Sequence, residues 1–590
     1  MNILKNLSIN HNKWIKQDSN DTEIHQIKKI YNLDTITATI LANRKIVLQD
    51  ISAFLDPKLK QLMPNPSVLK DMDVACERLF YHLSKNSKIM IFGDYDVDGI
   101  TSVAILYKYL STLSNNLITF LPNRYKHGYG LSMLCIDEVI NAKPELVILL
   151  DNGSSSVIEI EKLIEHKIDS IIIDHHSVDG KLPRANAFIN PKRLDDTSQL
   201  DYLCTAGLVF MFVVAFNRML EQKNFFNNEI KKIDIMVFLD LVALGSVCDM
   251  VPLVKLNRAY VFQGIKLMQK RQNIPLKILY DVLKINKPID YEVLGYLIGP
   301  LINCGGRMGK SDLPLKLLLT NDENEATILS EKLIELNQNR QKEESKVVNL
   351  AIDQILDQQN SGDFIFAGSD SFLSGVIGIV AGRIKEIYNK PVCIYSIDKN
   401  TGICSASGRS IEGIDLGNII ISAKNSGLLI KGGGHTQAVG FSFYLNKLNE
   451  VESFINKKIS YLLKNNNIEE KNLIVDSVIP INSVNQFLAD KIQLLSPFGM
   501  NFKEPLFMLS CVKISNVKQI GANKNHLQLD VSDGFKYKIK SFCYKSLPGN
   551  LGDVLLKKNN EFVHLVVNIK SNFYQGKNYV NLVIVDIAEL

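Results

Sequence analysis

Three apolar segments between residues 88 and 176 each end in acidic or imidazole side chains. The segments are KIMIF (88–92), ELVILL (145–150) and DSIII (169–173), and they are followed by GDYDVDG, DNG and DHHS. Short apolar runs that alternate with helical stretches predict parallel strands covered on both faces. Because ligands bind beyond the carboxyl ends of such strands, the polar residues after them are expected to converge. The pattern therefore predicts an α/β unit with a polar site at one edge of its sheet.

The acids after the first segment crowd one another. Asp94, Asp96 and Asp98 alternate, and in an extended chain alternate side chains project to the same side. Close carboxylates repel, and the pKa of at least one of them rises. A single Asp after a strand is more often a helix N-cap than a ligand, by roughly three to one. Three alternating acids cannot all cap one helix, so we expect cations to neutralise them.

Other clusters supply the remaining ligand atoms. Asp151 follows the second segment, Asp174, His175 and His176 follow the third, and Asp249 lies in a loop after LVALGSVC (241–248). Carboxylate oxygens mixed with one or two imidazoles suit Mn²⁺ or Mg²⁺ better than zinc. Two such ions, about 3.5–4 Å apart, clamp a water and a phosphoryl oxygen for in-line attack. The composition of the clusters predicts a site for two divalent metal ions.

The rest of the chain divides into segments of different character. A proline-punctuated boundary ends a polar, partly helical N-terminal part, and a long charged helix separates two α/β units before a final set of short alternating strands. Such a helix usually bridges domains. The predicted divisions are an N-terminal segment at 1–65, a first α/β unit at 66–320, a connecting helix at 321–357, a second α/β unit at 358–465 and a small β-barrel at 466–590.

Composition excludes several classes of protein. The nine cysteines are single, with no CxxC pair, which argues against structural zinc and a disulfide framework. The N-terminus is too polar for a signal peptide, and the longest apolar run, GLVFMFVVAF (207–216), is too short to cross a bilayer and predicts a buried helix. We expect a cytoplasmic protein without a membrane partner. The net charge of +5 does not by itself indicate nucleic acid.

The ordered motifs DYDVDG, DNG, DHH and SVCDMVPL resemble the DHH phosphoesterase family, and most closely its bacterial members that degrade single-stranded DNA. The likeness runs from about residue 60 to the C-terminus. It also includes PNRYKHGYG (122–130), INCGGRMG (302–309), LNQNRQKEE (336–344), SGVIGIVAGRIKE (374–386), SASGRS (405–410) and KGGGHTQAVGF (431–441). The resemblance implies a DHH catalytic domain joined by the long helix to a DHH-associated domain, followed by an oligonucleotide-binding (OB) barrel.

The resemblance also implies a set of metal ligands. Asp151 would bridge the two ions. Asp94 and Asp96 would hold one ion, while Asp98, His175 and Asp249 would hold the other. Many relatives carry a histidine where this sequence has Phe92, which leaves one ion short of a ligand unless Asp94 or water substitutes.

Two further residues of the DHH cluster receive supporting roles from the family pattern. His176 would reach the scissile phosphate or lie behind the ligands, and Asp174 would orient the histidines.

Arginines in glycine-rich stretches favour anion binding. Arg124 precedes glycine turns, and Arg307 lies in CGGRMG, where we expect glycines to let backbone amides approach a ligand. SASGRS predicts a turn with Ser407, Arg409 and Ser410 as donors, and GGGH predicts a turn in close backbone contact, with His435 beside it. The resemblance implies that the DNA end and its 5′ phosphate are gathered by Arg124, Arg307, Ser407 and Arg409, with His435 nearer the scissile group.

The predicted barrel carries an alternating basic stretch. Lys536, Lys538 and Lys540 alternate with Tyr537 and Ile539, so period two places the lysines on one face. On the pattern alone, an ordinary solvent-facing strand is favoured by about two to one. OB barrels use such faces, with interleaved aromatics, to bind single strands. The resemblance therefore favours a DNA-binding face.

Three functions compete. The first is a metal-dependent 5′→3′ exonuclease that degrades single-stranded DNA to 5′-mononucleotides in repair and recombination, as a monomer with a single-stranded-DNA-binding protein and a helicase as partners. The second is a phosphoesterase of short oligonucleotides or cyclic dinucleotides. The third is a metal-free binding subunit. The complete set of acids and histidines disfavours the third, and the added basic β-domain disfavours the second, so we favour the exonuclease.

Overall fold

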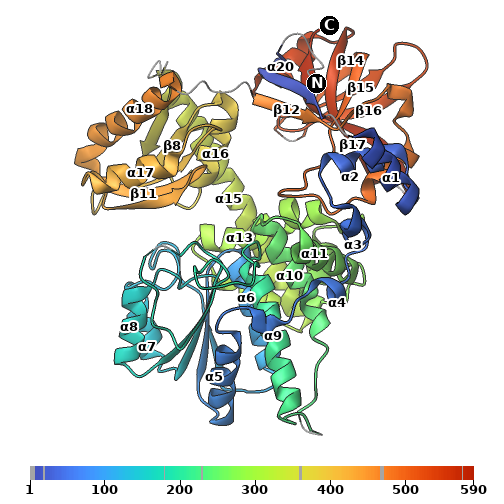
Figure 1. Cartoon of the computed structure of the whole chain (residues 1–590). Coiled ribbons are helices and arrows are strands. Elements are labelled where there is room, and N and C mark those ends of the chain that lie inside the picture. Colours follow the sequence, from blue (N-terminus) through green and yellow to red (C-terminus); the bar gives the residue numbers. More distant parts are fainter. Residues whose placement is uncertain are drawn as a thin grey trace.

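In the computed structural model, the described residues are 7–17, 20–178, 180–227, 230–357, 362–465, 471–521, 523–574 and 576–590. The predicted starts of the second unit at 358 and of the barrel at 466 lie outside them. Figure 1 shows the first α/β unit at the base, with the second unit and the barrel above it. Within the described residues, no helix is both long and apolar enough to cross a bilayer.

The first unit is built on a five-stranded, wholly parallel sheet of order β3-β2-β4-β5-β6. The strands are β2 (Ile89–Gly93), β3 (Leu117–Phe120), β4 (Leu146–Leu150), β5 (Asp169–Ile173) and β6 (Ala187–Ile189). The helices are α5 (Met72–Ser84), α6 (Val97–Leu110), α7 (Ile136–Asn141), α8 (Val157–Glu165), α9 (Thr205–Gln222), α10 (Leu239–Cys248), α11 (Lys255–Met268), α12 (Ile274–Val282), α13 (Gly299–Arg307) and α14 (Asp312–Leu319).

Both faces of this sheet are buried, as the apolar segments predicted. Ile89 and Ile91 of β2 pack with residues of α5, α6 and α9, whereas Met90 and Phe92 pack with residues of α7 and α8. Alternate side chains of a strand point to opposite faces, so a strand covered twice must be apolar throughout. The run at 207–216 lies within the buried helix α9, as expected.

The strand order locates the polar edge. The chain passes from β2 outward to β3 and then returns across β2 to β4, which makes the β2–β4 gap the topological switch point. Ligands bind at such a point because the loops diverge there and leave an opening. Asp94 follows β2 and Asp151 follows β4, so these two carboxylates flank it.

The second unit is reached by α15 (Glu323–Asp357), the long charged helix that the sequence predicted. Its mixed sheet has the order β10-β11-β9-β8-β7. The strands are β7 (Ile365–Ser369), β8 (Val392–Asp398), β9 (Ile403–Arg409), β10 (Lys431–His435) and β11 (Ala438–Tyr444), and the helices are α16 (Ile377–Tyr388), α17 (Leu416–Asn425) and α18 (Leu448–Asn465).

Two turns predicted in this unit are strands. SASGRS lies largely within β9 and GGGH within β10, and both pair with β11. The predictions were wrong because small residues suggest turns locally, whereas cross-strand pairing and packing decide the conformation here. Gly408 illustrates the packing, since a Cβ there would meet Cys393 Sγ at 2.7 Å.

The C-terminal part is a closed barrel of five strands. In their order of pairing, the strands are β14 (Phe507–Ile520), β15 (His526–Ser532), β16 (Lys538–Cys543), β18 (Lys577–Ala588) and β17 (Phe562–Tyr574). Pairing of β17 with β14 closes it. Around it lie β12 (Lys471–Val475), β13 (Ser477–Val478), α19 (Gln486–Gln493) and α20 (Asn550–Lys557). This is the predicted OB-like fold.

The N-terminal segment as far as Leu55 packs on the barrel, which the sequence did not reveal, whereas Leu59 joins the apolar core of the first unit. Its elements are β1 (Asn12–Lys16), α1 (Asp21–Tyr31), α2 (Thr35–Asn43), α3 (Ile51–Leu55) and α4 (Leu59–Leu62). The strand β1 pairs in parallel with β12, and Ile27 and Leu41 share one apolar core with barrel residues. Figure 1 shows the described N-terminal strand, in blue, beside β12 of the barrel domain.

A buried arginine joins the barrel to the first unit. Arg258 of α11 is 2% exposed and donates to the carbonyl oxygens of Phe54, Leu495, Ser496 and Pro497 at 2.8–3.0 Å. Burial lowers the pKa of Arg258 to about 9. Because these acceptors come from two separate segments, one side chain ties the N-terminal segment and residues 495–497, which precede β14, to the first unit.

Candidate active site

The acids of DYDVDG occupy a helix start rather than an extended strand. The helix α6 begins at Val97, Asp96 is its N-cap, and Asp96 Oδ1 accepts the N–H of Gly99 at 3.1 Å. A Cβ at Gly99 would lie 2.5 Å from the carbonyl oxygen of Asp94, so glycine lets the loop fold back closely. The extended conformation expected from alternation was wrong, because the N-cap bond turns the chain into a helix.

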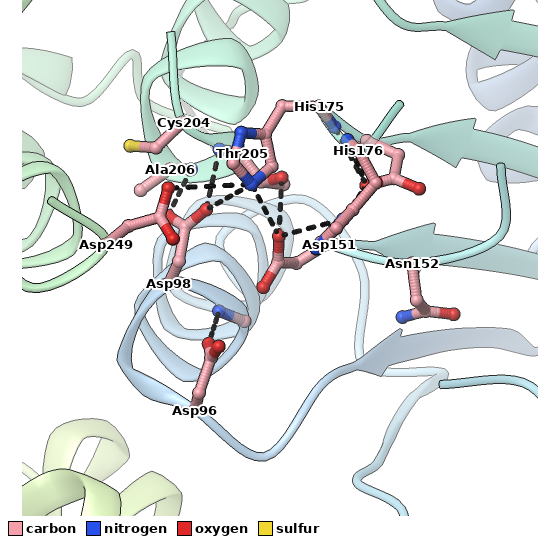
Figure 2. A network of polar contacts seen from close by, with 12 residues as sticks. Asp96, Asp98, Asp151, Asn152, His175, His176, Cys204, Thr205, Ala206 and Asp249 are labelled. Atoms are coloured by element: carbon pink, nitrogen blue, oxygen red, sulfur yellow. Dashed lines mark hydrogen bonds and ion pairs between the residues drawn. The ribbon is translucent and has the colours of Figure 1, made fainter. Parts of the chain in front are cut away.

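A second helix start holds Asp98. The backbone N–H groups of Thr205 and Ala206 donate to the two oxygens of Asp98 at 2.7 and 2.9 Å (Figure 2). These residues open the 18-residue helix α9, whose N-terminus carries a partial positive charge. The hydroxyl of Thr205 also donates to Asp151 Oδ1 at 3.0 Å. The start of α9 thus orients two of the predicted ligands.

An imidazole lies at the centre of the cluster. His175 Nε2 is 3.4 Å from Asp151 Oδ1, 3.5 Å from Asp249 Oδ2 and 4.0 Å from Asp98 Oδ2. Asp249 is the C-cap of α10, and Asp151 has a left-handed backbone with φ of 64°. Such a conformation is uncommon for residues other than glycine and often marks a functional position. Four separate elements therefore aim their side chains at one point (Figure 2).

His176 is held differently from His175. Its Nδ1 lies 2.7 Å from Asp174 Oδ1, and its Nε2 lies 2.9 Å from the hydroxyl of Tyr129. Asp174 also accepts the backbone N–H groups of Ser154 and of both histidines. Although burial opposes the charge, the hydrogen bond and the charge of Asp174 raise the pKa of His176 to about 9. For His175, burial and then repulsion from His176 lower the pKa to about 3.

The electrostatics of the cluster fit divalent cations. Burial, with repulsion from Asp96, raises the pKa of Asp98 to about 6, and burial with neighbouring acids raises the pKa values of Asp94, Asp151 and Asp249. One oxygen of Asp94 and one of Asp249 are buried without a hydrogen-bond partner among the described residues. Carboxylates that are both crowded and unpartnered indicate that a cation completes the site.

Three groups of side chains could each hold an ion, and the ligand atoms of each group lie within 4.8 Å of one another. Two of them share no residue, Asp94, Asp96, Asp151 and Asp98, His175, Asp249, whereas the third, Asp151, His175, His176, overlaps both. This division matches the predicted ligand sets, and the assignment itself stays a prediction. Phe92, where the family resemblance led us to expect a histidine, is fully buried and stacks on Phe120. It faces the sheet core and supplies no ligand atom.

Three arginines gather beside the metal cluster. Arg307 ends α13, and its pKa is lowered to about 10 by burial and then by repulsion from Arg124, Arg340 and Arg409. Arg124 lies over the ring of Tyr95, 5.7 Å from its centroid, and Tyr95 stands between Asp94 and Asp96. Within the described residues, Arg124, Arg307 and Arg409 form no ion pair with a carboxylate. Converging unpaired guanidinium groups favour an anion.

The glycines next to Arg307 have a different role from the one predicted. Gly305 and Gly306 lie inside α13, and a Cβ on them would meet Pro314 Cδ and Tyr95 Cδ2, both at 2.7 Å. The glycines therefore permit helix packing, and the expectation that they expose amides to a ligand was wrong. Gly375 of the second unit lies directly against the backbone of Arg307, since a Cβ added at Gly375 would lie 2.0 Å from the Arg307 carbonyl oxygen.

The second unit contributes the remaining predicted anion ligands. Ser407 and Arg409 lie on β9, and Arg409 Nη1 donates to the Gly408 carbonyl at 2.8 Å. Gly378, in the first turn of α16, is close enough that a Cβ would lie 3.0 Å from Ser407 Oγ. Ser410 is buried and donates to the Ile414 carbonyl, so it is not a free donor as predicted. His435 ends the edge strand β10 and is exposed.

The lysines of the barrel do not form one free row. Lys536 precedes β16 in a turn closed by Asp533, and Lys538 pairs with Asp530 at 2.8 Å. Lys540 lies over the ring of Phe542, 5.8 Å from its centroid. The predicted row of three lysines on one strand was wrong, because β16 starts at Lys538 and leaves Lys536 outside it. The DNA-binding role of the three lysines stays a prediction.

Sequence reasoning missed two groups that order the site. Thr205 and Ala206 act through backbone N–H groups, which no side-chain motif signals. Tyr129 donates from its hydroxyl to the carbonyl of Asp151 at 2.9 Å, and its position within PNRYKHGYG was the one available signal.

Family models match three parts of the chain. They are the N-terminal domain of the DHH family at 88–246, the DHHA1 domain at 361–461 and the RecJ OB domain at 475–586. The single-stranded-DNA-specific exonuclease RecJ of Haemophilus influenzae is 30% identical over 486 residues, which cover 80% of this chain and 83% of that protein. The chain belongs to the RecJ family. RecJ of Bacillus subtilis is 27% identical over 529 residues, and the match spans 64% of its length.

Solved RecJ structures share the architecture. RecJ of Thermus thermophilus in complex with Mn²⁺ superposes with a TM-score of 0.80 at 23% identity, over 98% of this chain and 80% of that one. An exonuclease RecJ bound to manganese gives a TM-score of 0.57 at 27% identity, covering 69% of this chain and 98% of that one. The RecJ fold thus includes the two α/β units and the barrel seen here.

Proposed function

We propose that this chain hydrolyses single-stranded DNA from its 5′ end and releases 5′-mononucleotides, with two divalent metal ions, Mn²⁺ or Mg²⁺, held by the acid and histidine cluster. Its RecJ relatives are named as single-stranded-DNA-specific exonucleases, and solved RecJ structures contain Mn²⁺ or Mg²⁺. Bound ions would activate a water and neutralise charge on the scissile phosphate. The remaining steps depend on the protein's own side chains.

The observation that carries the proposal is the position of Tyr95. Its neighbours Asp94 and Asp96 belong to the metal cluster. The guanidinium group of Arg124 lies over the ring of Tyr95, and the same ring packs against Gly306, one residue before Arg307. The anion site and the metal site therefore adjoin within the length of a few side chains. An end phosphate in the arginine group would place a nearby phosphodiester at the carboxylates, which is the geometry for end-directed cleavage.

Two further residues are suited to the reacting phosphate. His176 is charged near neutral pH because Asp174 stabilises its proton, so we assign it to a non-bridging phosphate oxygen. Asp174, oriented by three backbone N–H groups, would keep the ring in place. We assign His435, on the exposed edge strand β10, to the DNA backbone nearby.

The barrel and its partners extend the proposal. We assign strand binding to the exposed side of β16, where Lys540, Phe542 and Tyr544 alternate on one face. A single-stranded-DNA-binding protein and a helicase, as the family resemblance implies, would supply single strands to a monomer in repair and recombination.

The test uses strands that differ only at the 5′ end. With a 3′ fluorophore and Mn²⁺, we expect a 5′-phosphorylated strand to bind more tightly than its 5′-hydroxyl counterpart, and Arg409→Ala to remove that preference. Arg184→Ala is the control, since Arg184 makes an exposed ion pair with Glu161. Release of mononucleotides first from the 3′ end would refute the assigned polarity. An unchanged preference in the Arg409 variant would refute the role of Arg409 at the end phosphate.

A further inference from the structure

The proposed end-phosphate site is built from both α/β units. Arg124 and Arg307 belong to the first unit, whereas Ser407 and Arg409 lie on β9 of the second. The two pairs can bind one phosphate only if the units keep a fixed spacing. A residue that fixes this spacing would act on the site without touching the DNA.

The start of α16 lies between the two pairs. Gly375, two residues before this helix, lies against the backbone of Arg307. Gly378, in the first turn, lies against the other pair, since a Cβ added there would be 3.0 Å from Ser407 Oγ and 3.5 Å from Arg409 Nη2. The position of α16 therefore bears directly on the distance between Arg307 and Arg409.

The helix α15 runs from the first unit to the second (Figure 1). Leu333 packs in the apolar core of the first unit and Val347 in that of the second. Between these two positions the buried side chains of α15 are polar, since Arg340 is 7% and Glu344 8% exposed. Apolar burial is non-directional, so the polar pair is better suited to fix how the units face each other.

Glu344 binds two guanidinium groups at once. Its Oε2 accepts Arg340 Nη1 at 2.7 Å, and its Oε1 accepts Nη1 of Arg383, on α16, at 3.1 Å. Arg340 is held a second time, because its Nε donates to Asn337 Oδ1 at 2.9 Å. Charge-assisted hydrogen bonds are strong and add geometric specificity. Glu344 therefore ties α16 to the middle of α15.

Arg340 connects this group to the first unit. The helix α13, which ends at Arg307, packs on α15, where Cys304 Sγ donates to the Leu333 carbonyl at 3.7 Å. Repulsion from Arg340 is among the causes that lower the pKa of Arg307, so the two guanidinium groups are near each other. The carboxylate of Glu344 offsets the charge of Arg340, which lets Arg340 lie buried beside another cation.

A buried ion pair that serves stability alone is the simpler interpretation, but desolvation offsets much of the attraction in such pairs. Stability alone does not explain why one carboxylate is shared between the helix that spans both units and the helix that touches both halves of the phosphate site. We propose that Glu344 is a positioning residue for the end phosphate, a role that rests on the proposed function. It holds Arg340 and Arg383 together, and so keeps the two halves of the site at the spacing that one phosphate needs.

The experiment compares strands that differ only at the 5′ end, with full-length protein and Mn²⁺. Phosphorothioate linkages, which resist hydrolysis, allow dissociation constants to be measured by fluorescence anisotropy, and ordinary linkages give turnover at saturation. Glu344→Gln should lower the affinity preference for the 5′-phosphorylated strand about tenfold, the factor for one charge-assisted hydrogen bond. Turnover at saturating 5′-hydroxyl strand should fall much less, because the metal cluster is untouched.

Further variants test how Glu344 acts. Glu344→Asp keeps the charge but shortens the side chain by one methylene group, so it should lose the preference as Glu344→Gln does. Arg383→Met should have the same effect, and its combination with Glu344→Gln should add little, because both changes remove one contact. Glu335→Gln, at an exposed position on α15, is the matched control and should keep the preference.

The proposal is overturned if Glu344→Gln or Glu344→Asp keeps the preference, or if the effects of Glu344→Gln and Arg383→Met add in full. It is also overturned if the preference and 5′-hydroxyl turnover fall equally in Glu344→Gln, which would indicate a purely structural role. A parent protein without any preference for the 5′ phosphate would instead refute the end-phosphate site itself, and the role of Glu344 with it.

Discussion

Trp14 donates its indole N–H to Asp586 Oδ2 at 2.9 Å, across 572 residues of chain. Both residues are fully buried, and Asn10 and Asn12 also donate to this carboxylate, at 3.0 and 2.8 Å. The buried charge of Asp586 is thus satisfied by hydrogen bonds from the N-terminal segment. The first strand of the protein is consequently part of its last domain.

The first prediction concerns this docking. Asp586→Ala leaves the Trp14 indole and the Asn12 amide without acceptors, so we expect the barrel to lose about 2–4 kcal/mol of stability. Trp14 is the only tryptophan, so its fluorescence emission reports on the segment directly and should shift to longer wavelength in the variant. Asp553→Ala, in the same barrel on α20, is the control. An unshifted emission maximum in Asp586→Ala would show that the contact is dispensable.

The second prediction concerns the metal cluster. Asp151→Asn keeps the side-chain shape but removes the charge shared by both predicted ligand groups, so turnover should fall at least about 100-fold. Calorimetric titration with Mn²⁺ should also show weaker binding at both sites. Asp312→Asn, in an exposed pair with Lys316, should leave both measurements unchanged. Near-normal turnover in Asp151→Asn would contradict the bridging role.

The third prediction concerns pH and stability. Burial raises the pKa of Asp240 to about 6, despite the hydrogen bond from Asn273. Between pH 4 and 6 the folded state therefore binds more protons than the unfolded state, so stability falls as pH rises through this window. Asp240→Asn removes the buried charge. The free energy of unfolding of this variant should exceed that of the parent by near zero at pH 4 and by about 2–3 kcal/mol at pH 7.

Urea denaturation of the metal-free protein, followed by circular dichroism across this pH range, measures that difference. Asp312→Asn is again the control, because its carboxylate is exposed. A gain for Asp240→Asn that does not change with pH would mean that the carboxyl group does not titrate in this window.

The fourth prediction separates two lysines of β16. Lys538 already pairs with Asp530, whereas Lys540 stacks on Phe542, which in turn stacks on Tyr544 with centroids 5.9 Å apart. Lys540→Ala should therefore weaken single-strand binding more than Lys538→Ala and should reduce its salt dependence more. Fluorescence anisotropy over a range of salt concentrations measures both effects. Equal losses of affinity in the two variants would favour a face on which all lysines contribute alike over one organised by Lys540, Phe542 and Tyr544.

Local sequence determined the elements whose signal lies within a few residues. The apolar runs of β2, β4 and β5 are buried on both faces and so could be recognised without partners. The acids and histidines that follow them were also recognisable, because parallel strands bring their ends together in any fold of this class. The long helix α15 could be predicted from its charged composition and its helical periodicity. The type of ion followed from the donor atoms.

Only the tertiary structure decided which distant groups complete each site. The N-terminus of α9 lies about 110 residues from Asp98 along the chain, and its backbone N–H groups have no sequence signature. The glycines beside Arg307, the strand β9 and the pairing of β1 with β12 depend on what packs against them. Long-range contacts are selected by the burial and hydrogen bonding of whole surfaces, so local pattern specified the chemistry here and packing specified its geometry.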